Sequence, residues 1–193
     1  MYIIERNIAD ATIERVDQYP WNCAYQPRVE FYLIFKKSIG FILNIKCFES
    51  HPKADYRNHG DPVYKDSCLE FFVNFFPELE EKGYLNFEMN ANGAMLLCFG
   101  LNRTQRINMI QRLETKHHVE RTLDYWSIEL VIPLSFIHEI YDISDFSTGH
   151  RIKANVYKCG DCTDMPHYGC WSFIQSENPD FHRPEYFATM MLV

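Results

Sequence analysis

The segment KDSCLEFFVNF, residues 65–75, alternates in side-chain character from one position to the next. Its odd positions from residue 69 onward are all apolar: Leu69, Phe71, Val73 and Phe75. Its even positions mix acids and an amide with a thiol and an aromatic ring: Asp66, Cys68, Glu70, Phe72 and Asn74. Side chains two residues apart lie on the same face of a strand, so the pattern predicts a β-strand with one buried face. The opposite face then combines hydrogen-bonding groups with a ring, which calls for an explanation.

The same period of two recurs in short segments along the chain. These segments are residues 28–35 and 40–49, which form a predicted hairpin, and then 84–90, 94–100, 125–134, 151–160, 170–174 and 185–193. The clearest helical segment is residues 134–142, directly after Pro133. Many short strands joined by turns are typical of an antiparallel β-sandwich. We therefore expect a mainly β protein, a jelly-roll or immunoglobulin-like sandwich with one short helix, in a single domain over residues 1–193.

The composition argues against nucleic-acid binding and against a membrane span. The formal net charge is −7, and no stripe of Lys and Arg provides the basic surface that nucleic acid requires. No run of about 18 apolar residues is present to cross a membrane. The start MYIIERNIAD lacks the features of a signal peptide, so a cytoplasmic location is expected unless the N-terminus was trimmed. The seven cysteines are then expected to be mostly reduced thiols.

A second strand, YLNFEMN at residues 84–90, repeats the division into an apolar and a polar face. If it pairs with residues 67–75, one sheet surface carries Glu70, Phe72, Asn86, Glu88 and Asn90. Carboxylates and amides offer the donors and acceptors that sugar hydroxyls need, and an aromatic ring packs on the apolar face of a pyranose. By itself, the alternation fits the ordinary solvated face of an antiparallel sheet at least as well.

Two further segments carry polar side chains that suit a binding surface. The strand at residues 151–160 places Arg151 on a polar face, and arginine can contact two hydroxyls at once. The turn NPDFHRPEYF (178–187) places Asp180, His182 and Arg183 around its prolines. Those three side chains could bind a ligand, or the turn could be a proline-braced connection with Phe181 packed inward.

Four stretches resemble the family 9 carbohydrate-binding modules and their relatives. They are PVYKDSCLEFFV (62–73), YLNFEMNANG (84–93), the strand from Trp126 to Pro133, and WSF with PDFHRPEYF near the C-terminus. The resemblance extends from about residue 20 to the C-terminus. It implies a β-sandwich that binds sugars, often the chain ends of plant polysaccharides, between two aromatic rings.

The resemblance also assigns roles to individual residues. It implies Tyr64 as one ring, at a position where the studied modules tend to have tryptophan, and Trp171 as the second ring. It implies Glu70 as an acceptor for a sugar hydroxyl. Modules of this family often carry structural calcium, and the candidate oxygen ligands here are Asp66, Asp161 and Asp164. No other cofactor is expected.

A zinc site is an alternative use of the segment CGDCTDMPHYGC (159–170). Its C-x2-C-x4-H-x2-C spacing supplies the ligand types of a structural zinc site: Cys159, Cys162, His167 and Cys170. The last interval is shorter than that of a zinc knuckle. The other interpretation is a loop of reduced cysteines.

The sequence thus predicts non-catalytic binding of a saccharide, with oligo- or polysaccharide ends in glycan catabolism as ligands and a glycoside hydrolase as a candidate partner. The predicted binding residues are Tyr64, Glu70, Asn86, Glu88, Asn90, Arg151 and Trp171. Two alternatives stay open. One is a glycoside hydrolase that uses Glu70 and Glu88 as its acid pair, which would need a raised pKa in a deep site. The other is a protein-interaction sandwich that binds no glycan.

Overall fold

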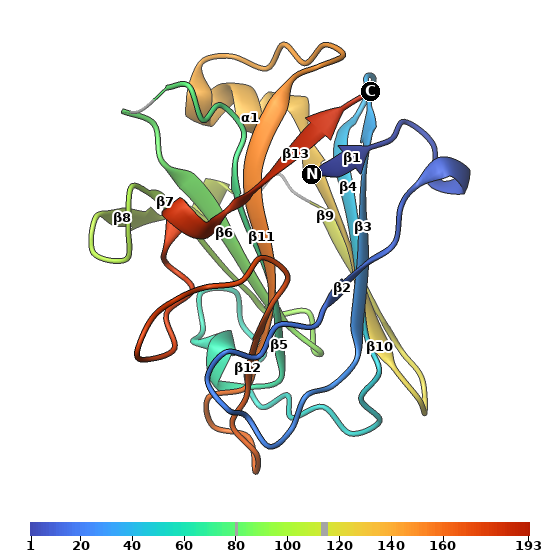
Figure 1. Ribbon diagram of the computed structural model, residues 1–193, viewed down its shortest axis with the longest axis vertical. Helices are drawn as coiled ribbons and strands as arrows, with labels where there is room; N and C mark the ends of the chain where they lie inside the picture. Colours follow the sequence, from blue (N-terminus) through green and yellow to red (C-terminus); the bar gives the residue numbers. More distant parts are fainter. Residues whose placement is uncertain (80, 113–115) are drawn as a thin grey trace.

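The computed structural model describes residues 1–79, 81–112 and 116–193. Within these residues, thirteen strands form two sheets that face each other as a β-sandwich (Figure 1). The hydrogen-bonded order is β1-β13-β11-β5-β6-β7-β8 in the larger sheet, with β12 paired to β11, and β2-β3-β4-β10-β9 in the smaller sheet. The predicted mainly β sandwich is confirmed.

The strands of the larger sheet are β1 (Tyr2–Ile4), β5 (Cys68–Asn74), β6 (Tyr84–Asn90), β7 (Met95–Gly100), β8 (Arg106–Asn108), β11 (Arg151–Cys159), β12 (Tyr168–Cys170) and β13 (Ala188–Leu192). The strands of the smaller sheet are β2 (Glu14–Val16), β3 (Val29–Lys36), β4 (Gly40–Cys47), β9 (Lys116–Arg121) and β10 (Trp126–Pro133). Short 3-10 helices cover residues Ile8–Asp10, Val63–Lys65, Ile110–Arg112 and Pro184–Tyr186. The predicted hairpin at 28–48 is β3 and β4, which pair from Val29↔Cys47 to Lys36↔Gly40.

The predicted helix is present as α1 (Leu134–Tyr141), which begins directly after Pro133. Its buried side chains, Phe136, Ile137, Ile140 and Tyr141, lie on one face at helical spacing. The helix ends at Tyr141 and is capped by Asp142, which has a left-handed backbone (φ 61°) and donates its N–H to the carbonyl of His138 at 2.8 Å. Among the described residues, no helix has the length and apolar character needed to cross a membrane.

Two predicted strand boundaries are wrong. The segment 170–174 was expected to be a strand, but β12 ends at Cys170 and the following residues bend away. The last strand begins only at Ala188, because Pro184 starts a 3-10 helix that ends at Tyr186. A proline at the first position of a helical turn is favoured there and donates no hydrogen bond to a strand.

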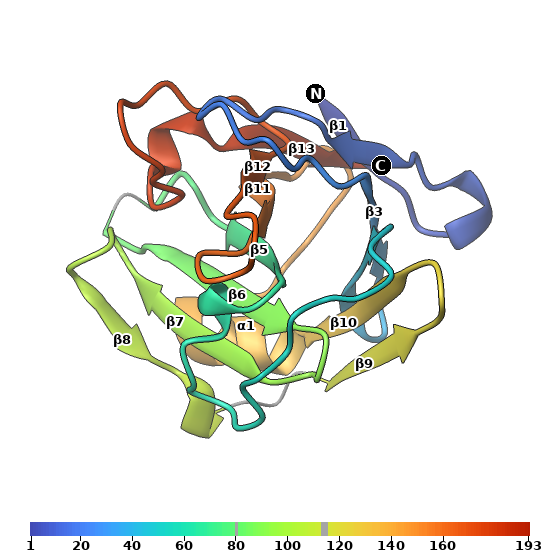
Figure 2. The same ribbon diagram turned by 90° about the horizontal axis from the view of Figure 1, so that it is seen from below.

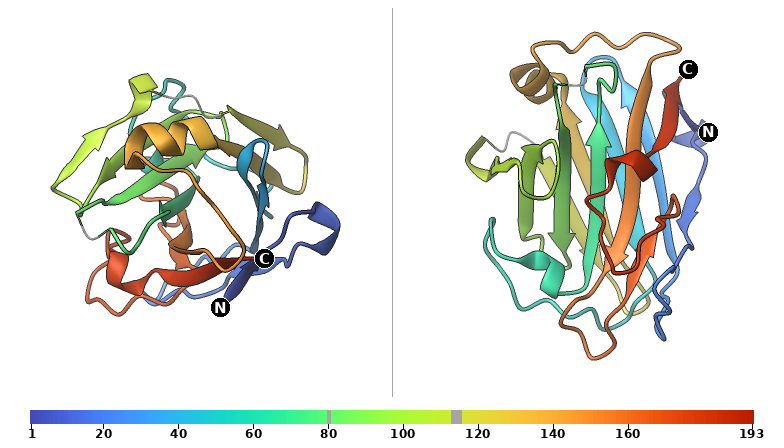
Figure 3. Two further views of the ribbon diagram at one scale, coloured as in Figure 1. Left: turned by 90° about the horizontal axis from the view of Figure 1, so that it is seen from above. Right: turned by 60° about the vertical axis from the view of Figure 1, so that its left-hand side comes forward.

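The larger sheet is buried on both faces. Its inner face packs against the smaller sheet in one apolar core, which includes Leu69, Phe71 and Val73 of β5. Its outer face carries a second apolar cluster around Phe72, Tyr84 and Tyr157. The chain between β12 and β13 runs along this outer side, in front of β11 and β5 in the right-hand view of Figure 3. The outer face is therefore covered by protein over much of its area.

Two further segments, which are bonded to each other, cover one end of the outer face. The 3-10 helix Val63–Lys65 precedes β5, and the loop 160–167 follows β11, which pairs with β5. Two backbone hydrogen bonds join them, from Asp161 N to the Tyr64 carbonyl and from Cys162 N to the Lys65 carbonyl, both at 3.1 Å. Figure 2 shows the two segments side by side at the end of β5. Together they build a wall above the strands.

Candidate functional site

The floor of the site is the outer face of three neighbouring strands. Glu70 of β5 lies directly opposite Glu88 of β6 on one side and Tyr157 of β11 on the other. Because side chains alternate between the faces, these three residues point away from the core that holds Leu69 and Phe71. The prediction that residues 67–75 and 84–90 pair and share a polar surface is confirmed.

The chain between β12 and β13 forms the roof over part of this floor. The ring of Phe181 stacks on Tyr157 with centroids 4.1 Å apart and planes inclined by 7°. Phe187 packs edge-on against Tyr84 with centroids 5.2 Å apart. As a result Glu70 and Glu88 are each only 3% exposed, so the interpretation of this surface as a solvated sheet face is wrong.

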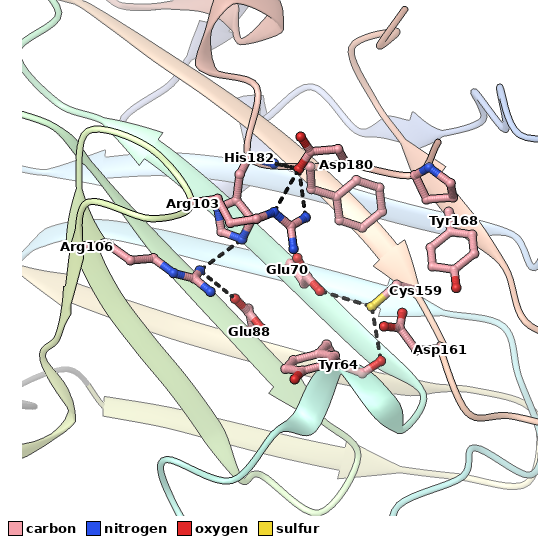
Figure 4. A pocket seen from close by; sticks show the side chains of 12 residues that line it. Tyr64, Glu70, Glu88, Arg103, Arg106, Cys159, Asp161, Tyr168, Asp180 and His182 are labelled. Atoms are coloured by element: carbon pink, nitrogen blue, oxygen red, sulfur yellow. Dashed lines mark hydrogen bonds and ion pairs between the residues drawn. The ribbon is translucent and has the colours of Figure 1, made fainter. Parts of the chain in front are cut away.

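Between the floor and its walls lies a cavity of about 330 Å³ (Figure 4). This volume falls at the small end of the range for ligand pockets. The cavity is lined by Tyr64, Glu70, Glu88, Arg103, Arg106, Cys159, Asp161, Tyr168, Pro179, Asp180, Phe181 and His182. Charged, thiol and aromatic side chains from six separate segments converge here, which is typical of a binding site.

The pKa values of the two floor carboxyls are raised. Burial, the nearby thiol of Cys159 and the charge of Glu88 raise the pKa of Glu70 well above its ordinary value of 4.5. Burial also raises the pKa of Glu88, to about 7, although Arg106 and Asn86 oppose this rise. Arg106 lies 3.7 Å from a Glu88 carboxylate oxygen, and the Asn86 amide donates to the same oxygen at 2.8 Å. The floor can therefore both donate and accept hydrogen bonds near neutral pH.

A histidine links the roof to the rim of the cavity. Arg106 donates to Nε2 of His182 at 2.9 Å, so that nitrogen must be unprotonated, since arginine only donates. The proton on Nδ1 is then donated to the Tyr84 hydroxyl at 2.8 Å. Burial and the charge of Arg106 lower the pKa of His182 to about 3, so it stays neutral at physiological pH.

An ion pair spans the mouth of the cavity. Arg103, from the loop between β7 and β8, donates to Asp180 at 2.7 Å and 3.2 Å. Asp180 is held in the turn at 178–183 by the backbone N–H of His182, at 3.1 Å. The Arg103 side chain is 56% exposed, so this pair can rearrange when a ligand arrives.

Two half-buried tyrosines form opposite sides of the cavity in Figure 4, with Cys159 and Asp161 between them. Tyr64 is carried by the 3-10 helix Val63–Lys65. Tyr168 begins β12 and lies opposite Cys159 in register. Both rings can therefore present a face to a bound molecule.

Three of the seven predicted binding residues line the cavity: Tyr64, Glu70 and Glu88. Asn86 and Asn90 are buried beside it and bond to protein groups. Asn86 donates to Glu88, as described above. Asn90 donates to the Tyr56 carbonyl at 2.9 Å and to Asp66 at 2.8 Å, and it accepts from Asn92 N and Ala94 N. These two amides hold the strand and turn that support the floor.

The other two predicted residues lie elsewhere. Arg151 begins β11 and is exposed opposite Met191, eight residues before Cys159 and therefore roughly 26 Å from it along the strand. Trp171 packs edge-on against Tyr2 and Phe31, with centroids 6.1 and 5.5 Å apart, at the margin of the main core. Cys170 belongs to the outer cluster, so the next side chain, Trp171, turns to the opposite face.

Several cavity residues were missed from the sequence. Tyr168 shares the outward face with Cys170, and strict alternation through β12 could have identified it in place of Trp171. Ligand binding by Asp180 and His182 was one of the two interpretations of the 178–187 turn, and both residues line the cavity. No local sequence pattern marks Arg103 and Arg106 as site residues, because the fold alone brings the β7–β8 loop and the first residue of β8 to the cavity.

The three acids that the sequence offered as candidate calcium ligands lie apart in the fold. Asp66 is buried in the turn before β5, Asp161 lines the cavity, and Asp164 lies in a separate surface hollow. One oxygen of Asp66 accepts from Tyr56 N and Asn90, whereas Oδ1 is buried with no hydrogen-bond partner among the described residues. That oxygen fits a calcium ligand, but the three acids do not form one cluster.

The predicted zinc spacing is also dispersed by the strand geometry. Cys159 faces the cavity, Cys162 is exposed, and His167 turns inward to accept a hydrogen bond from Lys158 at 2.7 Å. Cys170 is buried in the outer cluster. The seven cysteines all lie in the described part of the chain, and none of them forms a disulfide there.

A second hollow of about 520 Å³ is lined by loop residues that include Tyr25, His51, Lys53 and Asp164, and also by Glu49 and the buried His167. It is larger than the cavity on the sheet. We assign the functional site to the smaller cavity, because two buried carboxyls with raised pKa values form its floor.

Comparisons with known proteins agree on one family. The profile of carbohydrate-binding family 9 matches residues 2–192. A proposed carbohydrate-binding protein from Bacteroides uniformis ATCC 8492 has a similar structure, with a TM-score of 0.82, 25% sequence identity, and coverage of 100% of this chain and 97% of that chain. No curated protein sequence matches the chain.

Structures of a family 9 carbohydrate-binding module from Caldicellulosiruptor kristjanssonii, in complex with glucose and with cellotriose, are also similar. Each has a TM-score of 0.69 and 10% identity, and covers 99% of this chain and 94% or 92% of that chain. At this identity they show the shared sandwich fold. Because the family profile spans nearly the whole sequence, the chain belongs to carbohydrate-binding family 9, a family of non-catalytic carbohydrate-binding modules.

Proposed function

We propose that this protein binds the terminal ring of an oligo- or polysaccharide in the cavity between Tyr64 and Tyr168, without covalent chemistry. The observation that carries the proposal is a cavity with a tyrosine on each of two sides and a floor of two buried carboxyls whose pKa values are raised. A volume of about 330 Å³ suits one sugar ring better than several in a row. The family to which the chain belongs supports the class of ligand.

The tyrosines would supply the apolar part of the binding energy. The C–H groups of a pyranose form an apolar face, and packing that face on an aromatic ring removes both surfaces from water. The Tyr64 carbonyl accepts one backbone hydrogen bond from the 160–167 loop, and Tyr168 is paired in register with β11. Neither backbone has to become ordered when the sugar arrives, which lowers the entropic cost of binding.

The polar groups would select the hydroxyls. A protonated Glu70 can donate one hydrogen bond and accept others, and Glu88 can change role with pH around 7. Asp161, Asp180 and Arg103 lie higher on the walls and would contact hydroxyls near the mouth. Sugar hydroxyls both donate and accept, so a lining of mixed acids and arginine meets their requirements.

The arrangement of the acids favours binding over hydrolysis. A glycosidase places its two carboxyls on either side of the scissile bond. Here Glu70 and Glu88 are direct neighbours on adjacent strands, so both approach a ligand from the floor. Glu70 accepts from the Cys159 thiol at 3.0 Å, and Glu88 is occupied by Arg106 and Asn86. A role beside a glycoside hydrolase in glycan breakdown is consistent with such a binding module.

The test is calorimetric titration with glucose, cellobiose, xylo-oligosaccharides and a wider glycan panel. We expect a dissociation constant between millimolar and micromolar for at least one sugar class, about −4 to −8 kcal/mol. If one ring is held, lengthening the ligand from two rings to three should change the affinity by less than about threefold.

Three tyrosine variants identify the surface used. Tyr64→Ala and Tyr168→Ala should each weaken binding by roughly tenfold or more, as expected when an aromatic contact is lost. Tyr125→Ala is the matched control, because Tyr125 lies in the turn before β10 of the smaller sheet, where it contacts Lys46 and Glu120. Equal losses in all three variants would place the site elsewhere.

Two other outcomes would support the alternative functions. Release of reducing sugar that Glu88→Gln abolishes would support a hydrolase. The absence of binding heat with any glycan would support an interaction protein.

Calcium has a separate place in this proposal. We propose that Asp66 contributes its unpartnered Oδ1 to a structural calcium ion that braces the turn before β5. Calcium should then raise the melting temperature of the wild-type protein in the absence of sugar, and Asp66→Asn should remove the increase. Asp164→Asn, an exposed acid, serves as the control. An equal calcium effect in wild type and Asp66→Asn would refute this site.

A further inference from the structure

Three metal-binding side chains meet on the floor of the cavity. Cys68 and Glu70 are two residues apart on β5 and therefore share its outer face. Cys159 lies directly opposite Cys68 on β11. The Cys68 and Cys159 sulfurs and a Glu70 carboxylate oxygen all lie within 4.8 Å of one another. Among the residues that the structure describes, no other three His, Cys, Asp or Glu side chains are grouped in this way.

The geometry of the group is close to that of a zinc site. Zinc binds thiolate sulfur at about 2.3 Å and carboxylate oxygen at about 2.0–2.2 Å in a tetrahedron, which separates its ligand atoms by about 3.5–3.8 Å. The Cys159 sulfur already lies 3.0 Å from a Glu70 oxygen. Small rotations of these side chains would therefore be enough to surround a cation, and two sulfurs favour a thiophilic one.

The group is also accessible from one side. Cys159 and Glu70 line the cavity, whereas Cys68 is fully buried behind them. A cation held by the three would therefore have its fourth position facing the cavity, where Asp161 lies beside Cys159 (Figure 4). The strands fix all three residues in register, so the site does not depend on the ordering of a loop.

We propose that Cys68, Glu70 and Cys159 form a binding site for a thiophilic divalent cation, zinc by preference, with one coordination position open to the cavity. This site differs from the C-x2-C spacing seen in the sequence, because it joins Cys159 to a cysteine 91 residues earlier rather than to Cys162. It goes beyond sugar binding and does not depend on it. Zinc would displace the thiol protons and any proton on Glu70 into solution, because thiolates and carboxylates are the ligand forms.

The probe is cobalt(II), added in the absence of sugar to protein kept reduced by a phosphine. We expect saturation at one equivalent, with thiolate-to-cobalt charge-transfer bands in the near ultraviolet and strong visible bands of tetrahedral coordination. Zinc should displace the cobalt and abolish these bands. The enthalpy of zinc binding should vary with the ionisation enthalpy of the buffer, which reports the released protons.

Variants separate this site from the alternatives. Cys159→Ser, Cys68→Ser and Glu70→Gln should each lower zinc affinity by at least about 100-fold, since even the loss of an outer-shell partner costs about 10–100-fold. Cys162→Ser is the matched control, because it removes the exposed thiol of the C-x2-C pair and should leave affinity unchanged. Circular dichroism without metal shows which variants fold. If Cys68→Ser does not fold, Glu70→Gln and Cys159→Ser are enough to test the site.

Three results would overturn the proposal. The first is the absence of thiolate–cobalt bands in the folded, reduced wild-type protein. The second is an equal loss of affinity in Cys162→Ser, which would return the metal to the C-x2-C loop. The third is cobalt binding that survives Cys159→Ser with its thiolate bands intact. Because no sugar is present, failure of sugar binding would not change any of these outcomes.

Discussion

Two buried polar clusters lie on opposite faces of the same strands, and they differ in how fully their charged groups are paired. The outer cluster borders the cavity of the candidate site, and the inner cluster reaches the larger second hollow through Glu49 and His167. The inner cluster joins Lys158 of β11 to Ser67, Glu49, His167 and Trp126 between the two sheets. The outer cluster joins Glu70, Glu88, Arg106 and Cys159 on the floor of the binding site. Side chains alternate between the faces, so adjacent residues such as Lys158 and Cys159 belong to different clusters.

The two charged groups of the inner cluster, Lys158 and Glu49, each have several hydrogen-bond or ion-pair partners. The fully buried Lys158 ammonium donates to Ser67 Oγ at 2.8 Å, to the Cys159 carbonyl at 2.9 Å and to His167 Nε2 at 2.7 Å. Glu49 accepts from Ser67 and from Trp126 and lies 3.8 Å from Lys158. Burial would raise the pKa of Glu49, but Lys158 and these hydrogen bonds lower it below its ordinary value. The cluster therefore holds a charge pair.

The outer cluster has more buried acids than cations to pair with them. Its two acids are buried side by side, and the pKa values of both are raised. Arg106 approaches Glu88, whereas Glu70 has the Cys159 thiol as its hydrogen-bond donor. The difference teaches that burial alone does not mark a functional site. Both clusters reach a hollow, but the partners of Glu49 offset the cost of burying its charge, whereas Glu70 and Glu88 keep bonding capacity for a ligand.

The largest effect should come from breaking the inner charge pair. Lys158→Met leaves Glu49 buried without its cation, and we expect a loss of about 3–5 kcal/mol in the free energy of unfolding. Urea denaturation measures this loss. Lys153→Met, on the same strand and only partly buried, should change stability by no more than about 0.5 kcal/mol. An unchanged stability of Lys158→Met would show that the pair is dispensable.

The next effect separates a core ring from a cavity ring. Trp171→Ala removes a partly buried ring packed on Tyr2 and Phe31, and we expect a loss of about 3 kcal/mol in unfolding free energy. Its sugar affinity should remain within about twofold of wild type when measured well below the melting temperature. Tyr168→Ala should show the reverse pattern. A tenfold loss of sugar affinity in folded Trp171→Ala would restore Trp171 as the second ring.

A smaller effect should appear in the pH dependence of stability. The pKa of Glu88 is raised from 4.5 to about 7 by burial, so the folded state binds more protons than the unfolded state in this interval. Stability contributed by this group therefore falls as pH rises from 4.5 to 7. Relative to Glu88→Gln, the wild-type protein should lose about 2 kcal/mol between pH 5 and pH 7 in urea titrations. Parallel pH profiles for the two proteins would contradict the raised pKa.

The smallest stability effect should come from the ion pair at the mouth. Arg103 is 56% exposed and Asp180 30% exposed, so Arg103→Ala should lower stability by less than about 1 kcal/mol. Sugar affinity should fall by roughly tenfold if Arg103 contacts hydroxyls as proposed. Arg183→Ala, which removes the exposed pair with Glu185, is the control and should alter neither property. Unchanged sugar affinity in Arg103→Ala would limit the role of the pair to closing the loops.

Local sequence patterns determined the strands and the floor of the site. The alternation in residues 65–75 and 84–90 was sufficient to place Glu70 and Glu88 on one surface, and the register sets them directly opposite each other. Pro133 and the apolar spacing after it were sufficient for α1. These features depend on contacts between neighbours in the chain or on one strand pairing, which the period of two encodes directly.

The walls and roof depended on tertiary structure, because their residues come from segments far apart in the sequence. Arg103, Asp161, Tyr168 and Asp180 meet only after three loops fold over the sheet. That folding buries a face that the sequence alone left open to solvent. Burial then raises the pKa values of Glu70 and Glu88, a change that no local pattern reports. The sequence by itself thus determined which side chains share a face, and only the tertiary structure decided which of those faces became a binding site.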